Sequence, residues 1–549
     1  MRESRRRIWS WPVVSAAVWV LAGCAGPPVA ENVSLAPGPN PAVPLVGVLT
    51  FTSDRPVVPT LLIEDGERRQ TVTPDPEART EHEIPVLGLR PARTHTVTVT
   101  LRDARGRETT LEPLSIETPP LPDDTPPIAV TVRRPAAMEP GITMIPVFRW
   151  KSATEGDRDW GSAVFGVDAE GEVVWFYKDD LGAAEVRRKR NGNLLFGQAE
   201  DGRMVEMDML GNVVSTWYSA GVVLDELPEG AIPVDTDVFH HDVIELPSGN
   251  FLGLGLALRH FEDFPAEYPP GTKRAPTNVA GDVLIEFRPD GSTVRKWEVL
   301  DILDPERLGE GSLNTGFYDD QYEGKVDPLP IDISHSNAIL YLEDEDAAVV
   351  SSNVQCVIYK VDLATGELEW LLGDPAGWRE PWASKLLEPV GELIWPCHQH
   401  GIELTPRGTY LLYDNGGGRA IPPNPPMPPD ERYSRAVEYR VDEEARTVEE
   451  VWSYGPEHER FISPYISDAD HLPETGNVLI TDGGRMAGPD GEIMGTFGGR
   501  QWGRVLEVTY GEQPEKVWEL VVDDPGGRYA IYRSQRFRSL YPKLDRPTG

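Results

Sequence analysis

The sequence predicts an all-β protein: a six-bladed β-propeller preceded by a small N-terminal β-sandwich. Three observations favour this fold class. Glycine and proline each occur 52 times and tryptophan 15 times in 549 residues, which is typical of a turn-rich β protein. Short alternating strand patterns fill residues 43–118. From about residue 140 a strand-rich unit that ends in tryptophan recurs, and the chain is too long for one ordinary core.

The N-terminus has the features of a secretory signal. Four arginines precede an apolar run from about Ile8 to Gly23, which is short for a membrane span. Leu21-Ala22-Gly23-Cys24 resembles a bacterial lipobox, in which cleavage before Cys24 exposes that cysteine for lipidation. An ordinary signal with a chance cysteine is the alternative. Because Ala25 rather than an acidic residue follows, we expect a periplasmic protein that is lipid-anchored to the outer membrane of a Gram-negative bacterium.

The domain boundaries follow from composition. We expect a lipoprotein signal peptide over residues 1–23 and a tether over residues 24–42, which are rich in Pro, Ala, Gly and Asn. Residues 43–118 are the N-terminal β-sandwich. Residues 119–139 begin with a proline-rich stretch and form a linker, and residues 140–549 form the propeller.

The acidic charge balance limits the classes of partner. Asp and Glu number 89 against 52 Lys and Arg, a net charge of −37. This balance argues against nucleic acid or an anionic membrane surface as a partner. A small anionic substrate needs only a local positive pocket and is not excluded. Besides Cys24, only Cys356 and Cys397 are present, and a disulfide and two buried free thiols are equally open.

The repeat from residue 140 onward consists of an apolar strand, a turn such as Asp-x-x-Gly, and a strand that ends in tryptophan. Six equivalents of one four-stranded unit indicate a propeller. Irregular spacing predicts long inserted loops, most clearly at 302–332 and 419–434, and such loops usually build a site. We expect Tyr529–Leu540 to close the ring against the first blade. The repeated tryptophans are Trp175, Trp217, Trp297, Trp370, Trp452 and Trp518.

Three short segments contain half of the ten histidines: His240 and His241, His335, and His398 and His400. Each segment precedes a strand-like run, and side chains two apart on an extended segment point the same way. Because the first strand of a propeller blade lines the central channel, we expect His240, His335 and His398 at equivalent positions on three blades. Asp242, Asn337 and His400 follow two residues later, and Asp468 is the match on the next blade.

Such a constellation allows three kinds of chemistry. A neutral imidazole can accept a transferred group on its nitrogen and pass it on, while neighbouring polar groups stabilise the anionic group in transfer. Two histidines in a His-x-His pair can also hold a metal ion. The third possibility is structural, with histidines hydrogen-bonded in a wet channel.

The chain resembles the bacterial arylsulfate sulfotransferase family, the periplasmic type that uses no nucleotide sulfate donor. The resemblance covers about residues 43–520, and the ordered set of motifs is fairly specific. The matching segments are Phe239-His-His-Asp-Val-Ile-Glu-Leu-Pro-Ser-Gly-Asn250, His335-Ser-Asn337, Ser351-Ser352 with Val357–Asp362, Gln399-His400 with Tyr413-Asp-Asn-Gly416, and Ala436-Val-Glu-Tyr439 with Val451–Gly455.

The resemblance implies a six-bladed propeller and ping-pong transfer of a sulfuryl group from an aryl sulfate ester to a phenol, without cofactor or metal. His400 would be the nucleophile and would carry the group as sulfohistidine. His240, or His241 in its place, would hold the sulfuryl oxygens with His335 and Asn337. His335 or His240 would serve as the acid–base for the phenol oxygen. Trp395 would stack on the aryl group, and His398 would be a structural neighbour.

One departure from the family pattern concerns charge. The family places an arginine that binds the sulfuryl group after the paired serines, where this chain has Asn353. Asn353 would bind the substrate in its place, but an asparagine donates hydrogen bonds and brings no charge. We expect Arg419 or Arg485 to substitute for it. The Cys pair also departs from the close local disulfide that the resemblance implies.

Two other functions stay open on the sequence. One is hydrolysis of the aryl sulfate, which would need no phenol. The other is a binding or envelope scaffold that has kept the propeller without the chemistry, which Asn353 favours.

Overall fold

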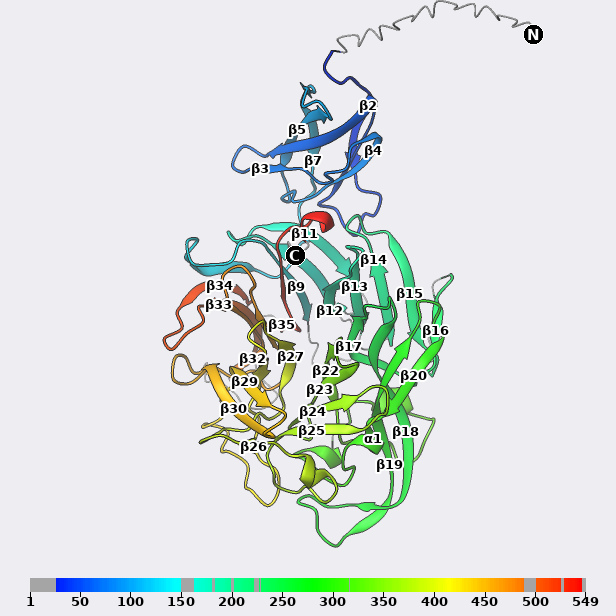
Figure 1. The fold of residues 1–549 in the computed structure, drawn as a ribbon, viewed down its shortest axis with the longest axis vertical. Helices are drawn as coiled ribbons and strands as arrows, with labels where there is room; N and C mark the ends of the chain where they lie inside the picture. Colours follow the sequence, from blue (N-terminus) through cyan, green and yellow to red (C-terminus); the bar gives the residue numbers. More distant parts are fainter. Residues whose placement is uncertain are drawn as a thin grey trace, which may run out of the picture.

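The computed structural model describes residues 26–149, 162–179, 183–198, 202–221, 227, 229–314, 316–487, 500–524 and 528–545. The predicted signal peptide and Cys24 lie outside these residues. Figure 1 shows two bodies, a small N-terminal β domain and a larger set of sheets below it. No helix in the described part of the chain is both long and apolar enough to cross a membrane.

The N-terminal domain is built around one long strand, β2 (Gly47–Glu64). Its first half pairs with β1 (Ala30–Pro37) and β4 (Arg79–Val86), and its second half pairs with β3 (Arg69–Val72) and β5 (Thr94–Asp103). The strands β6 (Glu108–Thr110) and β7 (Leu114–Glu117) add to β5. Apolar side chains from both halves of β2 share one core, as in a small sandwich. The predicted tether of residues 24–42 is wrong over β1, because Ala30–Pro37 pairs along β2.

Six further sheets follow in chain order, and each is built on consecutive strands that pair antiparallel. The first three contain β9 (Ile142–Arg149), β10 (Ser162–Val167) and β11 (Val173–Asp179); β12 (Ala183–Arg188), β13 (Leu194–Gln198), β14 (Arg203–Met207), β15 (Val213–Ser219) and β16 (Ile232–Val234); and β17 (Phe239–Glu245), β18 (Phe251–Pro265), β19 (Arg274–Phe287), β20 (Thr293–Glu298) and β21 (Ile331–Asp332).

The last three sheets contain β22 (Ser336–Leu342), β23 (Ala347–Ser352), β24 (Val357–Asp362) and β25 (Leu368–Gly373); β26 (Glu388–Pro389), β27 (His400–Leu404), β28 (Tyr410–Asp414), β29 (Arg435–Asp442) and β30 (Thr447–Tyr454); and β31 (Asp468–His471), β32 (Val478–Ala487), β33 (Arg500–Val508) and β34 (Lys516–Val522). The short strands β16, β21 and β26 add to their sheets in parallel. The short helices are α1 (Val299–Ile302), η1 (Ser312–Asn314), α2 (Asp319–Tyr322), η2 (Trp382–Lys385) and η3 (Pro542–Leu544). The predicted fold class, all-β with an N-terminal β domain before a propeller, is confirmed.

The ring of sheets is closed by both ends of the propeller segment. Strand β8 (Ile128–Arg133) pairs with β34 of the sixth sheet. Strands β35 (Tyr529–Ile531) and β36 (Gln535–Phe537) pair with β9 of the first sheet, as the sequence predicted for Tyr529–Leu540. The predicted linker of residues 119–139 is therefore wrong over β8, which belongs to the propeller.

The repeated tryptophans join each sheet to the next. All six lie on the last of the consecutive antiparallel strands of their sheet, before any short parallel strand is added. The Trp175 indole donates to the carbonyl of Met209, in the turn between β14 and β15 of the following sheet, at 3.1 Å. Trp518 of the sixth sheet donates to the carbonyl of Ala169, between β10 and β11 of the first, also at 3.1 Å. This last bond links the end of the ring to its start.

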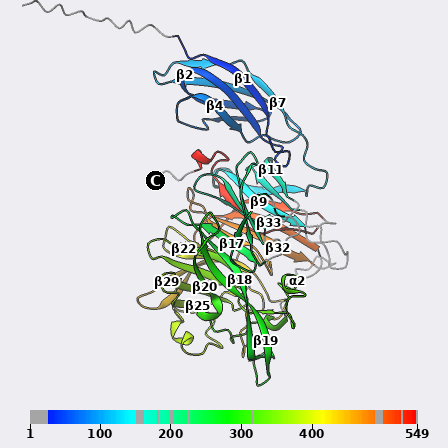
Figure 2. The ribbon, with the colours of Figure 1, turned by 90° about the vertical axis from the view of Figure 1, so that its right-hand side faces the viewer.

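The inner strands β12, β17, β22 and β27 meet near the centre of the lower body, and β35 joins them there (Figure 1). Figure 2 shows the N-terminal domain standing above the propeller and the long hairpin of β18 and β19 extending away from it. Tyr541, near the C-terminus, lies between the two bodies, because its hydroxyl accepts a hydrogen bond from the Leu87 amide at 3.0 Å.

Candidate active site

The three histidine segments meet at the start of the inner strands. The Nδ1 atoms of His240 and His241 lie 2.9 Å apart. The ring centroids of His241 and His335 lie 4.6 Å apart. His400 belongs to the same group, because the charge of His335 contributes to the low pKa of His400 and both histidines contribute to the low pKa of His241. The structure thus brings together side chains from β17, from the residue before β22, and from β27.

The strand registers assign the equivalent positions differently from the sequence prediction. His240, His400 and Asp468 each lie opposite the fourth residue of the next strand, which is Leu254, Tyr413 and Thr481 respectively. In the fourth sheet that place belongs to Ile339, opposite Val350. The expected equivalence of His240 with His335 and His398 is therefore wrong. The reason is a bulge between His240 and Val243 and another between His400 and Glu403, which change the strand register, so that equal spacing in sequence no longer means equal position in the sheet.

His335 and His398 instead precede their strands in a left-handed backbone conformation. Their φ angles are +45° and +55°, and His241 in the β17 bulge has φ +52°. A side chain with a Cβ avoids this region at a cost of about 1 kcal/mol or more. Three such histidines in one cluster indicate that the surrounding contacts fix the backbone to present these rings.

The tautomer of His400 follows from the partners of its Nδ1. This atom lies 2.8 Å from Oδ1 of Asn415 and 3.1 Å from the carbonyl of His398. The Asn415 amide nitrogen donates to the carbonyls of Ser463 and Ile466, so its oxygen must face His400. Both partners of Nδ1 are therefore acceptors, which places the proton on Nδ1 and leaves the lone pair on Nε2.

Burial keeps His400 neutral. The residue is only 3% exposed. Desolvation, opposed in part by the hydrogen bond to Asn415 and aided by the charge of Arg533, lowers its pKa to about 3. A neutral imidazole with a free Nε2 lone pair is the nucleophilic form of histidine.

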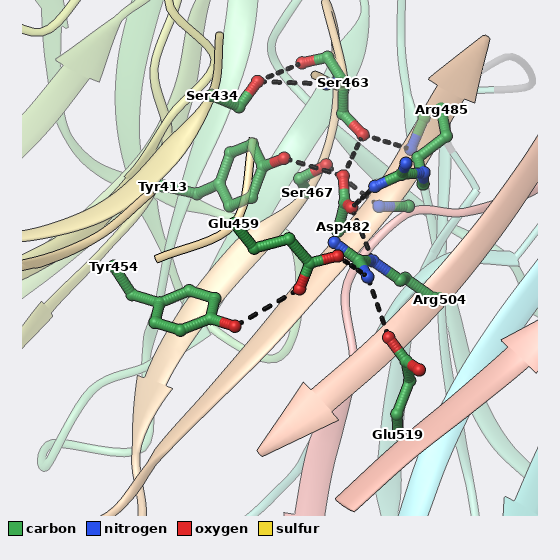
Figure 3. Close-up of polar contacts among 12 residues, drawn as sticks. Tyr413, Ser434, Tyr454, Glu459, Ser463, Ser467, Asp482, Arg485, Arg504 and Glu519 are labelled. Carbon is green, nitrogen blue, oxygen red and sulfur yellow. Dashed lines mark hydrogen bonds and ion pairs between the residues drawn. The ribbon is translucent and has the colours of Figure 1, made fainter. Parts of the chain in front are cut away.

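Asn415 is held by the polar network of Figure 3. Ser463, whose carbonyl accepts from Asn415, donates its hydroxyl to Asp482 at 2.6 Å. Ser434 donates its hydroxyl to the Asn415 carbonyl at 2.8 Å, and the Tyr413 hydroxyl donates to Asp482 at 2.9 Å. The orientation of the His400 ring thus depends on residues of the fifth and sixth sheets.

His240 and His241 have different hydrogen-bond partners. The Nε2 atom of His240 lies 3.1 Å from the carbonyl of Gly255, an acceptor, so Nε2 carries the proton and Nδ1 accepts from His241. Both nitrogens of His240 are therefore engaged inside the protein. His241 faces His335 edge-on, with an interplanar angle of 82°. Of the two, His241 is the better placed to meet a substrate.

His335 is paired with a carboxylate and covered by an aromatic ring. Its Nδ1 lies 2.5 Å from Oδ2 of Asp332. The Phe317 ring, which is 54% exposed, lies 4.4 Å from the His335 ring between centroids. Tyr318 lies 5.8 Å from it. Phe317 and Asp332 both come from the long loop at 302–332, which the sequence singled out for length alone.

Asn337 and Asn353, which were expected to bind substrate, hold the histidine segment instead. The Asn337 amide donates to the carbonyl of Gln399 at 2.8 Å, and the Asn353 amide donates to the carbonyl of His398 at 2.9 Å. Asn337 is fully buried. The expectation that they contact the sulfuryl group is therefore not supported, because the two amides bind consecutive backbone carbonyls within the His398–His400 turn.

A disulfide fixes the same segment. Cys356, in the turn between β23 and β24, is bonded to Cys397, which directly precedes His398. This settles the alternative that the sequence left open in favour of the disulfide. Ser351 adds a hydrogen bond to the carbonyl of Gln399 at 3.2 Å. The nucleophile candidate is thus attached to the fourth sheet by covalent and polar contacts.

Trp395 and the two expected substitute arginines are engaged in contacts within the protein. Trp395 packs in the apolar cluster between the fourth and fifth sheets. Arg419 is bound to Asp414 and lies over the Tyr433 ring, 4.5 Å from its centroid. Arg485 is bound to a buried carboxylate in the same manner. The predictions that Trp395 stacks on the aryl group and that Arg419 or Arg485 replaces the missing charge are therefore not supported.

The sequence reasoning missed Arg533, which enters the centre from the closing segment between β35 and β36. It donates to the carbonyl of Asn337, and its Nη1 lies 2.9 Å from Glu185 and 3.4 Å from Asp242. Its charge also lowers the pKa of His400. The expected return of this segment to the first blade was the only signal that could have placed it here.

A cavity of about 370 Å³ lies farther along the inner strands. Its lining includes Ile339–Tyr341, Gly401–Glu403, Asp470 and Arg533, but not the clustered histidines. Burial raises the pKa of Glu403 to about 7 and that of Asp470 well above its ordinary value. Arg533 both lines this cavity and acts electrostatically on His400, so it lies at the boundary between the two regions.

Neither group of potential metal ligands in the described residues fits an ion well. The groups are Cys356, Cys397 and His398, and Glu345, Glu369 and Glu443. Both thiols of the first are joined in the disulfide. The Lys360 ammonium is already placed among the three glutamates, 2.8 Å from Glu443 and 3.0 Å from Glu369.

Two curated proteins are similar to this chain in sequence. The chain is 27% identical over 400 residues to the arylsulfate sulfotransferase AssT of Escherichia coli O6:H1 (strain CFT073). It is 26% identical over 409 residues to AssT of Lelliottia amnigena. Each match covers 66% of this chain and 63% of the relative, so the chain spans slightly less than two thirds of these relatives' length.

Solved structures are more distant. A protein of unknown function from Bacteroides caccae is 12% identical, covers 72% of this chain and 98% of its own, and has a TM-score of 0.38. A streptogramin B lyase is 11% identical with the same coverage and a TM-score of 0.32. TM-scores this low do not support a conclusion about the fold or function of this chain.

The sequence profiles of two domains decide the family. The profile described as an arylsulfotransferase Ig-like domain matches residues 37–119. The profile described as arylsulfotransferase (ASST) matches residues 131–533, most of the chain. Together with the all-β fold, these matches show that the chain belongs to the arylsulfotransferase (ASST) family.

Proposed function

We propose that this protein is an aryl-sulfate sulfotransferase that moves a sulfuryl group from an aryl sulfate ester to a phenol through a sulfohistidine at His400. The observation that carries the proposal is the fixed tautomer of His400, with Nδ1–H bound to Asn415 and Nε2 left with its lone pair. Family membership and the two named relatives support the same reaction class.

The first half of the reaction forms the nitrogen–sulfur bond. The Nε2 lone pair of His400 attacks sulfur while the bond from sulfur to the aryl oxygen breaks. The electron pair of that bond leaves on the oxygen, which takes a proton from His335. The sulfated ring still carries the Nδ1 proton and becomes cationic, and the Nδ1–H bond to the Asn415 oxygen stabilises it.

The second half reverses these steps with an acceptor phenol. The phenol gives its proton to His335, its oxygen forms a bond to sulfur, and the nitrogen–sulfur bond breaks. His400 returns to the neutral imidazole. His240 takes no part in these steps, because both of its nitrogens are already engaged. His241 donates its Nδ1–H to His240 and keeps an Nε2 lone pair, which can accept a hydrogen bond from the phenol hydroxyl.

The aromatic surface for the substrate is Phe317. An exposed ring is costly in water unless a ligand covers it, and aryl groups favour offset stacking on such rings. Phe317 lies against His335, beside the proposed leaving oxygen, whereas Trp395 is packed in an inter-sheet core.

The test uses 4-nitrophenyl sulfate with and without phenol. We expect rapid release of one equivalent of nitrophenol per enzyme without acceptor, followed by steady release when phenol is added. Peptide mass analysis of the acid-sensitive intermediate is expected to place one sulfuryl group on the peptide that contains His400. Label on another residue, or release that requires no covalent intermediate, would contradict the mechanism.

Hydrolysis remains the second candidate, because the same attack followed by water would give it. Steady nitrophenol release at the same rate with and without phenol, with no aryl sulfate formed from the phenol, would favour the hydrolase. A complete lack of turnover with ligand binding retained would favour the scaffold.

We also propose that the chain is exported and lipidated at Cys24, on the strength of the lipobox-like sequence before it. Mass spectrometry of the N-terminal peptide after expression in a Gram-negative host tests this. A peptide that begins at Cys24 with attached acyl chains is expected, and an unmodified cysteine would contradict it.

A further inference from the structure

Asp332 is the only acid that contacts an imidazole of the candidate site through a short hydrogen bond among the described residues. Its Oδ2 lies 2.5 Å from Nδ1 of His335. Its Oδ1 accepts the backbone amides of Ser334 at 3.2 Å and His335 at 3.0 Å. Asp332 is 1% exposed and sits on β21, which pairs with β19. The carboxylate is therefore rigid, and it fixes both the ring and the backbone of His335.

The other nitrogen of His335 is turned away from Asp332. Its Nε2 has no hydrogen-bond partner among the described residues and is not fully enclosed. One ring face lies against Phe317 and one edge meets His241. With Nδ1 bound to a carboxylate, a proton on Nε2 would point to the space that these rings border.

The surroundings of His335 favour its charged form over that of the neighbouring histidines. Burial by itself lowers the pKa of His335, but the charge and hydrogen bond of Asp332, with a smaller effect from Asp282, outweigh burial and raise it. Burial lowers the pKa of His240 to about 4 and that of His400 to about 3. The acids and bases near His335 are Asp332 on β21, Asp282 on β19, His240 and His241 on β17, His398 before β27, His400 on β27, and Tyr318 in the loop.

Asp282 does not play the same part. Its Oδ2 accepts the amide of Ser336 at 2.6 Å, and its Oδ1 lies 3.5 Å from Nε2 of His240. Burial, and next the charge of Asp332, raise its pKa to about 7. Of the two acids, Asp332 is the one that carries a fixed charge beside an imidazole.

We infer that Asp332 is a positioning residue that holds His335 as an imidazolium with Nε2–H directed to the bridging aryl oxygen, and that this pair supplies the cation missing at Asn353. The inference rests on the proposed function. Its chemistry is specific: the Nε2 proton moves to the aryl oxygen as the sulfur–oxygen bond breaks, and Nδ1–H stays with Asp332. It follows that the transfer rate should depend on Asp332 more strongly for a donor with a poor leaving group than for one with a good leaving group, because only a basic leaving oxygen needs the proton.

The central experiment compares wild type with Asp332→Asn, with Asp282→Asn as the matched control. With phenyl sulfate as donor, we expect kcat to fall about 100-fold in Asp332→Asn, and with 4-nitrophenyl sulfate by less than about tenfold. The alkaline limb of the kcat/KM profile should move to lower pH, because the raised pKa of His335 falls when the carboxylate is removed. Asp282→Asn should stay within about threefold of wild type with both donors.

A readout independent of turnover separates this inference from the proposed function. NMR of ¹⁵N-histidine-labelled protein should show His335 titrating above the other buried histidines in wild type and below its ordinary pKa in Asp332→Asn. If wild type turns over no aryl sulfate but shows this titration, the proposed function fails and the inference about Asp332 and His335 stands as structure. Equal His335 titration in both proteins, or equal losses with both donors, would overturn it.

A double-mutant cycle covers the case in which Asp332→Asn merely disturbs the fold. If Asp332 acts through His335, adding Asp332→Asn to His335→Gln should leave the leaving-group dependence unchanged. A further change of more than about threefold in that background would show that Asp332 acts by another route. Asp332→Glu should restore part of the wild-type donor preference if the charge is what matters.

Discussion

The fifth and sixth sheets contain the same buried ion cluster built on different residues. In the fifth, Oδ2 of Asp414 lies 2.5 Å from Nη1 of Arg419 and 2.9 Å from Nε of Arg435. Arg435 also binds Glu450, at 2.9 Å, and Arg419 lies over the ring of Tyr433.

The sixth sheet repeats this arrangement atom for atom, as Figure 3 shows in part. Oδ2 of Asp482 lies 2.5 Å from Nη1 of Arg485 and 2.8 Å from Nε of Arg504. Arg504 also binds Glu519, at 2.8 Å, and Arg485 lies over the ring of Trp502.

The two sheets differ in what stands beside the aspartate. In the fifth sheet Asn415 follows Asp414 and binds His400. In the sixth sheet Gly483 follows Asp482, and the place of His400 is taken by Asp468, whose carboxylate lies 4.0 Å from Arg533. The repeated cluster therefore anchors the loop in both sheets, while the proposed chemistry depends on one amide, Asn415, and one histidine, His400. This separation explains why Arg419 and Arg485, although conspicuous in the sequence, are scaffold residues.

The largest effect should come from the ladder-equivalent pair His400 and Asp468. His400→Ala is expected to lower kcat/KM for 4-nitrophenyl sulfate by at least about 10⁴-fold, because no other group can form the covalent intermediate. Asp468→Asn should stay within about threefold. Steady-state kinetics with a phenol acceptor measure both. Comparable losses in the two variants would show that the fifth sheet is not chemically distinct.

Breaking the ion clusters should cost stability in both sheets. Asp414→Asn and Asp482→Asn each leave two buried arginines without their shared carboxylate, which costs about 3–5 kcal/mol. Denaturant unfolding followed by far-UV circular dichroism measures the loss. If only one of the two variants loses stability, the two clusters are not equivalent. Leu412→Val, a conservative core change in the fifth sheet, serves as a control of about 1 kcal/mol.

The disulfide ties the segment before the fifth sheet to the fourth sheet, and it has no counterpart in the described part of the sixth. Cys356 and Cys397 are 41 residues apart, so their bond restricts the unfolded chain by up to about 4 kcal/mol. The double variant Cys356→Ala with Cys397→Ala should unfold at lower denaturant and lose activity, since Cys397 precedes the His398–His400 turn. Unchanged kinetics at a temperature where the variant is folded would show that the hydrogen bonds to that turn suffice.

Acid should affect the two sheets in opposite directions. The pKa of His400 is lowered to about 3, so between that value and its ordinary 6.5 the unfolded chain binds a proton that the folded chain does not. Its contribution is lost as pH falls below 6.5, by about 3 kcal/mol at pH 4. Burial raises the pKa of Asp468, with Arg533 opposing, so its contribution is present at low pH and lost as pH rises.

Unfolding curves at pH 4 and pH 7 test this contrast. His400→Gln should lose less stability than wild type between pH 7 and pH 4, and Asp468→Asn should lose at least as much as wild type. If both variants lose the same amount, then neither group titrates as its burial implies.

The smallest effect on kcat is expected from Asn415, whose side-chain amide orients the His400 ring. Asn415→Leu removes the acceptor for Nδ1 of His400 and should lower kcat about 30-fold, because the wrong tautomer becomes accessible. Ser467→Ala in the sixth sheet removes a comparable bond, to the Gly483 amide, and should change kcat less than threefold. A shift in the pH profile of Asn415→Leu should accompany its loss of rate.

Local patterns were enough for much of the fold. The repeated tryptophans lie on the last of the consecutive antiparallel strands of each sheet, and the C-terminal segment closes the ring as predicted. The boundaries were less certain, because pairing partners lie far away in sequence. Ala30–Pro37 lies in a stretch rich in proline and polar residues, and Ile128–Arg133 directly follows the prolines of the predicted linker, so only pairing with β2 and β34 identifies them as strands.

The candidate site divides in the same way. The histidines could be chosen from the sequence because they are few and lie in similar local contexts. The sequence could not tell which of the histidines are equivalent, because bulges in β17, β22 and β27 change the strand register and have no recognisable sequence pattern. The roles of Asn337 and Asn353 were misjudged for a related reason: an amide next to a histidine can face a ligand or a backbone carbonyl, and only the folded distance decides.

By itself, the sequence determined the β repeat, the small N-terminal domain, the family motifs and the short set of histidines, because each of these depends on residue type and short-range spacing. The tertiary structure alone decided which nitrogen of His400 is free, which carboxylate faces His335, and where Arg533 enters the centre. These properties depend on atoms from different sheets that approach within hydrogen-bond distance, and separation along the chain does not encode that approach.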